Sequence, residues 1–166
     1  MKSLTVVMPC YNEQDTICAI VESVLSAPRL GLDIELIIVD DGSKDRSREI
    51  IAKLAELNPV IKSVLQDQNY GKGAAVRTGI GLATGDIIMI QDADLEYDPA
   101  EYPRLLAPIV AGHADVVYGS RFAGGDVRRV LYFWHSVANR LLTLLSNMFT
   151  NLNLSDMECC FKVFKK

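Results

Sequence analysis

Cysteine is scarce in this sequence and is not arranged for cross-linking or for metal binding. The chain has four cysteines among 166 residues, and no C-x-x-C pair occurs. The adjacent Cys159 and Cys160 are poorly placed for a disulfide or a zinc site. We therefore expect four reduced thiols, as in a cytosolic protein. The first residues lead directly into a strand pattern, so no signal peptide is evident.

Long apolar runs and an excess of basic charge are also missing. No apolar run reaches the roughly 20 residues that a membrane-spanning helix needs. The longest amphipathic stretch, residues 130–149, is interrupted by polar side chains such as His135 and Arg140, so it suits a membrane surface and not a crossing. With 17 basic and 21 acidic residues the net charge is −4, which gives no electrostatic case for nucleic acid as a partner.

The sequence does contain a regular alternation of apolar strand patterns and helix patterns. Strands are predicted at residues 4–8, 34–39, 60–65, 87–90 and 116–118, with an extended segment at 157–164. Helices are predicted after Asn12, around residues 50–57, at 73–83, after Pro99 and over 130–149. Asn12 is expected to cap the first helix, and Trp134 and His135 are expected to be packing residues of the last one.

This alternation indicates one α/β domain, residues 1–166, with a mostly parallel central sheet and helices on both faces. The length suits a single domain with a sizeable core, and no repeat, low-complexity tract or linker marks a boundary. Ligands of such sheets bind beyond the carboxyl ends of the strands, where the strand order reverses. Residues that carry chemistry should therefore come directly after strands.

Polar clusters do follow four of the predicted strands, at residues 9–13, 40–43, 92–94 and 119–121. The most informative of them contains Asp92 and Asp94, which are separated by one residue. In an extended segment both side chains point to the same side. Two carboxylates with open positions beside them suit Mg²⁺ or Mn²⁺ held chiefly through a substrate diphosphate. A D-x-D pattern is weak alone, but its position after a buried strand favours this interpretation.

The pair Asp40 and Asp41 has both a structural and a functional interpretation. Asp and Gly residues favour a turn here, and Ser43 or Asp45 would cap the helix that follows. Capping needs only one side chain, however, and two carboxylates stand next to each other at the ligand edge. A carboxylate in that place can accept a hydrogen bond from a base N–H or a ribose hydroxyl.

Basic residues near this edge suit the phosphates of a nucleotide. Residues 69–73 lack the P-loop and G-x-G-x-x-G patterns, but they open a helix and contain Lys72, which suits an anion or a purely structural role equally well. Arg121 follows a strand, and Arg128 and Arg129 follow a glycine pair. Arginine matches phosphate oxygens bidentately, although surface arginines are commonly only solvated.

Taken together, these stretches resemble glycosyltransferase family 2, and within it the enzymes similar to dolichol-phosphate mannose synthase. The matching stretches, which follow the order found in the family, are VVMPCYNEQ, IIVDDGSKDRS, NYGKGAAVRTG, DADLEYDP, VVYGSRF and LSDMECCFKVF. The resemblance implies the GT-A fold, a Rossmann-like three-layer arrangement. Relatives in that family continue well beyond the equivalent of Phe164, so the chain is expected to be shortened at its C-terminal end.

The resemblance also implies roles for individual residues. A nucleotide-sugar site is expected to include Pro9, Tyr11, Glu13, Val39, Asp41, Lys72, Asp92, Ala93 and Asp94. Catalytic roles are expected for Asp92, Asp94 and Arg121, with the two aspartates as ligands of Mg²⁺ or Mn²⁺. Arg121 and either Arg128 or Arg129 are expected to face phosphates of the donor or acceptor.

The expected reaction is transfer of a sugar, with inversion, from a GDP- or UDP-sugar. A sugar hydroxyl as acceptor would need a general base, whereas a lipid phosphate is already anionic near neutral pH. Asp156 and Glu158 are possible bases, but we favour a polyprenyl (dolichyl or undecaprenyl) phosphate. An enzyme that meets such a lipid is expected in the cytoplasm, peripherally associated with the inner face of the membrane.

Three alternatives stay open. The chain could transfer a sugar to a saccharide hydroxyl in cell-surface polysaccharide synthesis, or it could be a non-catalytic nucleotide-sugar-binding module. Intact Asp92 and Asp94 argue against the second of these. A nucleotidyltransferase should carry a glycine-rich, arginine-containing loop after the first strand, and residues 9–14 contain neither residue type.

Overall fold

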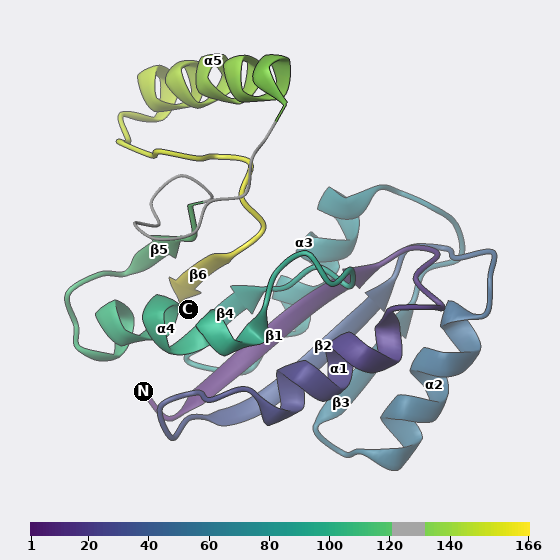
Figure 1. Ribbon diagram of the computed structural model, residues 1–166. Coiled ribbons are helices and arrows are strands. Elements are labelled where there is room, and N and C mark those ends of the chain that lie inside the picture. Colours follow the sequence, from purple (N-terminus) through teal and green to yellow (C-terminus); the bar gives the residue numbers. More distant parts are fainter. Residues whose placement is uncertain (121–131) are drawn as a thin grey trace.

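A six-stranded sheet forms the centre of the computed structural model, which describes residues 1–120 and 132–166 (Figure 1). The strands of this part of the chain are β1 (Ser3–Cys10), β2 (Asp33–Asp40), β3 (Ile61–Leu65), β4 (Ile87–Ile90), β5 (Val116–Tyr118) and β6 (Lys162–Lys165). The helices are α1 (Ile17–Ser26), α2 (Ser47–Leu57), α3 (Lys72–Leu82), the short 3₁₀ helix η1 (Pro99–Glu101), α4 (Tyr102–Val110) and α5 (Phe133–Thr150).

The sheet is mostly parallel, which confirms the predicted α/β class. Its strand order is β3-β2-β1-β4-β6-β5. The first four strands in this order run parallel to one another, whereas β6 is antiparallel to both β4 and β5. Because the chain moves outward from β1 to β2 and β3 and then returns to add β4 on the other side, the order reverses between β1 and β4. A ligand site is expected beyond the carboxyl ends of these two strands.

Two apolar cores cover the two faces of the sheet. Alternate residues of the central strands, such as Val6 and Val7 of β1, belong to different cores, as the period of a strand requires. The larger core packs α1, α2 and α4 on one face, and the smaller core packs α3 on the other (Figure 1). Gly79 lets α3 approach the sheet closely, because a Cβ at this position would overlap Val7.

The first helix begins later than the sequence suggested, and the prediction that Asn12 caps it is wrong. Asn12 has a positive φ of 56°, and its side-chain oxygen accepts a hydrogen bond from the backbone N–H of Lys44 at 2.8 Å. The carbonyl oxygen of Glu13 instead accepts the N–H groups of Thr16 and Ile17, where α1 begins. Asn12 therefore ties the β1–α1 loop to the β2–α2 loop.

Helix α5 stands apart from the sheet (Figure 1) and has its polar side turned toward the 154–157 segment. The buried residues of α5 are Asn139 and Thr143, and Asn139 donates to Asp156 at 2.9 Å. The prediction that Trp134 and His135 pack inside is wrong, since both are exposed and Trp134 is 76% exposed. The apolar residues instead cover the outer side of the helix; they include Phe133, Trp134, Val137, Leu141, Leu144, Met148 and Phe149.

A polar network around Glu35 joins the amino-terminal side of the sheet to the loop before β4. The Glu35 carboxylate pairs with Lys62 and accepts hydrogen bonds from Thr5 and from the backbone and hydroxyl of Thr84. Burial raises the pKa of Glu35, but the hydrogen bonds from Lys62, Thr5 and Thr84 outweigh it and lower the pKa from 4.5 to about 2. The network thus favours the charged carboxylate in the folded state.

This depressed pKa gives Glu35 a defined pH dependence. Its contribution to the free energy of unfolding is fully present above about pH 4.5 and is lost as the pH falls toward 2, because the unfolded state takes up the proton first. In Glu35→Gln we expect a lower urea midpoint of unfolding near neutral pH. As the pH falls from 4.5 toward 2, the urea midpoint of this variant should decrease less than that of the wild type. The control is Glu49→Gln, whose ion pair with Arg46 is largely exposed. If the urea midpoint depended on pH equally in wild type and Glu35→Gln, the prediction would be contradicted.

Candidate functional site

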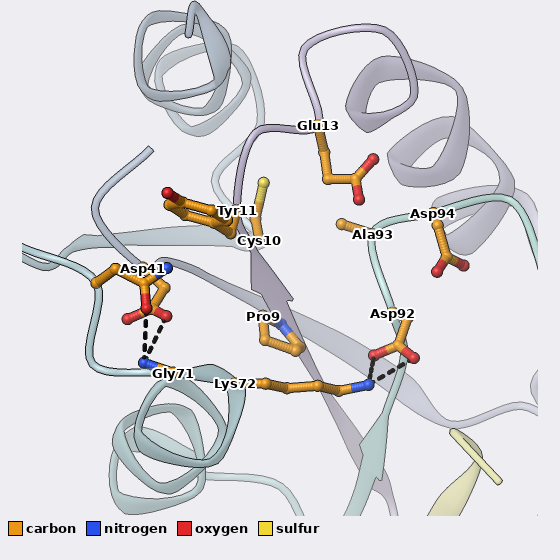
Figure 2. Close-up of a pocket in the computed structure, with 11 residues that line it drawn as sticks. Pro9, Cys10, Tyr11, Glu13, Asp41, Gly71, Lys72, Asp92, Ala93 and Asp94 are labelled. Atoms are coloured by element: carbon orange, nitrogen blue, oxygen red, sulfur yellow. Dashed lines mark hydrogen bonds and ion pairs between the residues drawn. The ribbon is translucent and has the colours of Figure 1, made fainter. Parts of the chain in front are cut away.

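A pocket of about 260 Å³ opens beyond the carboxyl ends of β1 and β4, at the place where the strand order reverses (Figure 2). Its walls come from the loops that follow β1, β2 and β4 and from the entry to α3. The residues that line it are Pro9, Cys10, Tyr11, Glu13, Asp41, Asn69, Gly71, Lys72, Asp92, Ala93 and Asp94. Residues separated by more than 80 positions in sequence thus meet in one cavity, as parallel strand ends do.

The loop after β1 is held in place by the loop after β2. The backbone N–H of Asn12 donates to Ser43 Oγ at 2.9 Å, and that of Glu13 donates to Ser47 Oγ at 2.8 Å. The Glu13 carboxylate accepts a hydrogen bond from the Thr16 hydroxyl at 2.6 Å. Tyr11 stays partly exposed at the mouth of the pocket, where its ring is available to a planar ligand.

Asp40 and Asp41 have different surroundings although they are neighbours. Asp40 is fully buried, pairs with Arg48 at 2.9 Å, and accepts the N–H groups of Gly42 and Ser43, so it shapes the turn below the pocket. Asp41 lines the pocket, and its two oxygens accept the N–H groups of Tyr70 and Gly71 at 2.8 Å each. Asp41 therefore fixes the turn that presents Lys72, and each of its oxygens has one further lone pair.

Gly42 allows the β2 turn to lie directly against the segment that precedes α3. Its φ is +73°, and a Cβ added to it would lie 2.6 Å from the backbone nitrogen of Asn69 and 2.8 Å from Cα of Gln68. Any larger residue would push these two segments apart. The contacts between Asp41 and the Gly71 turn depend on this close approach.

Lys72 and Asp92 form an ion pair across the pocket. The side chain of Lys72 extends from the start of α3, and its Nζ lies 2.5 Å from Asp92 Oδ1 and 2.7 Å from Oδ2 (Figure 2). The Lys72 side chain is 59% exposed, whereas that of Asp92 is 15% exposed. One ammonium group from an accessible position thus neutralises a largely enclosed carboxylate.

The segment of Asp92 and Asp94 is supported from behind by buried polar groups. Gln91 donates to the carbonyl oxygens of Asp92 and Tyr97 and accepts a hydrogen bond from the Tyr102 hydroxyl at 3.0 Å. The backbone N–H of Asp92 also points at Cys160 Sγ, 3.2 Å away. With Ala93 buried between them, the carboxylates of Asp92 and Asp94 lie on the same side of the pocket (Figure 2).

The thiols of the site are not arranged for nucleophilic chemistry. All four cysteines are free, and Cys10 and Cys160 are buried. Burial, with the negative charges of Asp40, Glu13 and Asp45, raises the pKa of Cys10 to about 12. Burial likewise raises the pKa of Cys160. Since the thiolate is the reactive form, both act as neutral packing and hydrogen-bonding groups near neutral pH.

Most of the predicted nucleotide-sugar residues meet in this pocket, but not all of them. Val39 is fully buried in the smaller core. Asp156 is 1% exposed beneath α5 and is not part of the pocket lining. Arg121, Arg128 and Arg129 lie outside the described residues.

Three lining residues were missed by sequence reasoning: Cys10, Asn69 and Gly71. All three lie within stretches that resemble the family, so position within these stretches was the available signal.

The carboxylates suit one kind of metal site. In the part of the chain that the structure describes, no group of three or more His, Cys, Asp or Glu side chains converges as a metal site would require. Asp92 and Asp94 therefore offer two carboxylates, and the remaining coordination positions of a metal ion would be left to other oxygen ligands. Mg²⁺ and Mn²⁺ bound through one or two carboxylates and substrate phosphates fit such a donor set, and a closed zinc site does not.

Comparison with protein families and curated sequences gives consistent matches. The model of the family described as Glycosyl transferase family 2 matches residues 5–166. The undecaprenyl-phosphate 4-deoxy-4-formamido-L-arabinose transferase of Pectobacterium carotovorum is 33% identical over 170 residues, and that of Photorhabdus laumondii is 34% identical over 169. Each match covers the whole chain and 50% of the relative, so the chain spans about half the length of these proteins.

Solved structures share the fold. Glucosyl-3-phosphoglycerate synthase from Mycobacterium tuberculosis, in complex with Mn²⁺, uridine diphosphate and phosphoglyceric acid, superposes with a TM-score of 0.72 at 23% identity. The match covers 99% of this chain and 56% of that one. S. aureus TarS matches with a TM-score of 0.58 at 25% identity, over 70% of this chain and 21% of the other. The fold is therefore that of GT-A glycosyltransferases.

Proposed function

This chain belongs to glycosyl transferase family 2, and we propose that it transfers a sugar from a nucleoside diphosphate sugar, a GDP- or UDP-sugar, to a polyprenyl phosphate. The transfer would invert the configuration at the anomeric carbon. We further propose that residues 1–166 act as one catalytic domain. The observation that carries the proposal is the pocket at the strand reversal, where Asp92, Asp94, Lys72 and Tyr11 face one cavity.

Each side chain of the pocket has a task in this proposal. The ring of Tyr11 would stack on the base of the donor, and Glu13 and Asp41 would accept from its polar groups. Asp92 and Asp94 would hold Mg²⁺ or Mn²⁺, which when bound offsets the negative charge of the leaving diphosphate. Lys72 and Arg121 would donate to the phosphate oxygens. Groups fixed in advance where charge develops are usually the largest contribution to catalysis.

A metal is supported by the donor set and by a structural neighbour. Two carboxylates on one side of the pocket suit a divalent ion that shares the diphosphate. The related synthase from Mycobacterium tuberculosis was crystallised with Mn²⁺ together with uridine diphosphate or uridine-diphosphate-glucose.

The choice of acceptor is supported by the relatives and by chemistry. Relatives 33–34% identical are named as undecaprenyl-phosphate sugar transferases. A phosphate oxygen is charged near neutral pH and needs no protein base. Asp156, the earlier candidate for such a base, is buried and accepts a hydrogen bond from Asn139, which suits a structural role.

The acceptor can be tested by transfer from labelled UDP- and GDP-sugars to undecaprenyl phosphate and, separately, to free saccharides. We expect transfer to the lipid phosphate, and we expect Asp156→Asn to lower turnover only modestly. Removal of a general base typically costs about 10²- to 10⁴-fold. Thermal melting of the variant separates a folding defect from a chemical one. Preferred transfer to a saccharide hydroxyl, with loss of activity in Asp156→Asn, would favour the alternative acceptor.

Helix α5 supports contact with a membrane surface. Its outer side is apolar and exposed, while its inner side is polar and hydrogen-bonded to the 154–157 segment. Within residues 1–120 and 132–166, none of the helices combines the length and hydrophobicity that crossing a bilayer requires. A helix that lies in the interface buries one apolar side in this way.

We expect the protein to float with phosphatidylglycerol-containing vesicles in a sucrose gradient. Trp134→Ser with Phe149→Ser should lower the bound fraction several-fold, because each removes a large exposed apolar side chain. The matched control is Leu57→Ser, which removes an exposed apolar side chain on α2, away from α5. Equal flotation of all three proteins would argue against α5 as the contact.

A further inference from the structure

The ion pair between Lys72 and Asp92 places a positive charge where the proposed metal would bind. One ammonium group is within 2.7 Å of both Asp92 oxygens. A divalent cation on the same carboxylate would lie close to this ammonium and be repelled by it. The two cations therefore compete for Asp92.

The structure indicates which of the two can move. Lys72 has a long flexible side chain that is 59% exposed, and its base is fixed, because Asp41 holds the N–H groups of the preceding turn. Asp92 is 15% exposed, and its backbone is held by Gln91 and Cys160. A largely enclosed carboxylate is stable only with a positive partner, so Lys72 leaves when another cation replaces it.

We propose that Lys72 is a displaceable counterion that makes metal binding depend on the donor diphosphate. Without ligands its ammonium neutralises Asp92. When a divalent ion and a diphosphate bind together, Asp92 would exchange its ammonium partner for the ion, and Lys72 would move to the diphosphate oxygens. The metal alone binds weakly because it leaves the ammonium without an anion. This inference rests on the proposed function and adds a coupling between its two binding steps.

Such coupling is reciprocal and can be measured without any turnover. If the diphosphate raises the affinity for the metal, the metal raises the affinity for the diphosphate by the same factor. The first measurement is a titration of Mn²⁺ binding, in which electron paramagnetic resonance monitors the loss of the free Mn²⁺ signal. It is made without nucleotide, with UDP and with GDP.

We expect Lys72→Met to bind Mn²⁺ alone about tenfold or more tightly than wild type, and to show a smaller enhancement by the diphosphate. Lys72→Arg keeps the charge and should retain weak binding of Mn²⁺ alone. The matched control is Lys44→Met, which removes an exposed positive charge outside the pocket lining. The hydrogen bond from Lys44 to Asn12 comes from the backbone N–H, so the substitution retains it. This control should leave Mn²⁺ binding unchanged.

A second measurement follows the lysine itself. In protein labelled with ¹⁵N-lysine, the Lys72 ammonium signal should shift when Mg²⁺ and the diphosphate are added together. It should change much less with Mg²⁺ alone.

The outcomes separate the inference from the function. Mn²⁺ binding that is equal in wild type and Lys72→Met, with the diphosphate still enhancing both, overturns the inference and leaves the proposed function intact. Absence of Mn²⁺ binding in every variant, with and without diphosphate, overturns the inference together with the metal site of the proposed function.

Discussion

Asp94→Ala is expected to lower metal-supported sugar transfer by at least about 10²- to 10³-fold, the size of effect seen when one group that stabilises developing charge is removed. Asp94 lies at the rim of the pocket and outside the apolar cores, so the fold should be retained. Turnover with Mn²⁺, Mn²⁺ affinity in the presence of UDP or GDP, and thermal melting should be measured on the same preparations.

Asp98 provides a control for the local structural part of this effect. The Asp94 carboxylate accepts the N–H of Glu96, and that of Asp98 accepts the N–H of Ala100, so the two substitutions remove the same kind of turn bond. Only Asp94 lines the pocket. Asp98→Ala should therefore retain transfer. Full wild-type turnover in the presence of EDTA would show that the reaction needs no metal.

Gly42→Ala should have the largest effect on the folded structure. Its positive φ strains any residue with a Cβ by about 1–3 kcal/mol. The overlap with the backbone of Gln68 and Asn69 adds a further cost of about 1–3 kcal/mol, because backbone cannot yield as a side chain end can. A combined loss of about 2–6 kcal/mol is a large part of the 5–15 kcal/mol that holds a typical domain folded. Urea unfolding followed by circular dichroism measures it.

Gly112→Ala separates the two parts of this cost. Gly112 has nearly the same φ, +75°, but nothing lies within 4 Å of an added Cβ. Gly112→Ala should therefore show only the backbone strain, while Gly42→Ala shows strain and overlap together. If both variants lost the same free energy of unfolding, the close approach of the Gln68–Asn69 backbone to Gly42 would make no contribution to the effect. In the folded fraction of Gly42→Ala, nucleotide binding should also weaken, because the turn that carries Lys72 is displaced.

The strands were predictable where burial on both faces leaves a continuous apolar run. Residues 87–90 coincide with β4, which is buried throughout, whereas residues 116–118 coincide with β5 through their apolar pattern although Val116 is 55% exposed. The start of α1 was not predictable, because Asn12 has good capping chemistry but a more distant partner in Lys44. The exposure of Trp134 and His135 on α5 was missed for a related reason. Helical spacing shows which residues share a side but not which side meets the protein, and Asn139 and Thr143 turned out to be the inner ones.

The neighbourhood of the site was predictable, but the partners of its residues were not. The rule that ligands bind after parallel strands led to the correct edge, where Tyr11, Asp41, Asp92 and Asp94 line one pocket. The different surroundings of Asp40 and Asp41 depend on contacts with Arg48 and Gly71, which no local pattern contains. The roles assigned to these residues stay predictions until binding and turnover are measured.

The position of β6 in the sheet has a consequence for the order in which the protein can fold. β6 lies between β4 and β5, so Ile90 of β4 pairs with Lys162, and Tyr118 of β5 pairs with the same residue. While the chain is being synthesised, β4 therefore keeps an open edge and β5 has no strand to join until residue 162 has emerged. Unpaired edges of this kind attract other strands, and pairing across such a sequence separation is slow. The growing chain thus passes through a stage in which β4, beside the future pocket, can pair with β1 on one side while its other side has no partner strand.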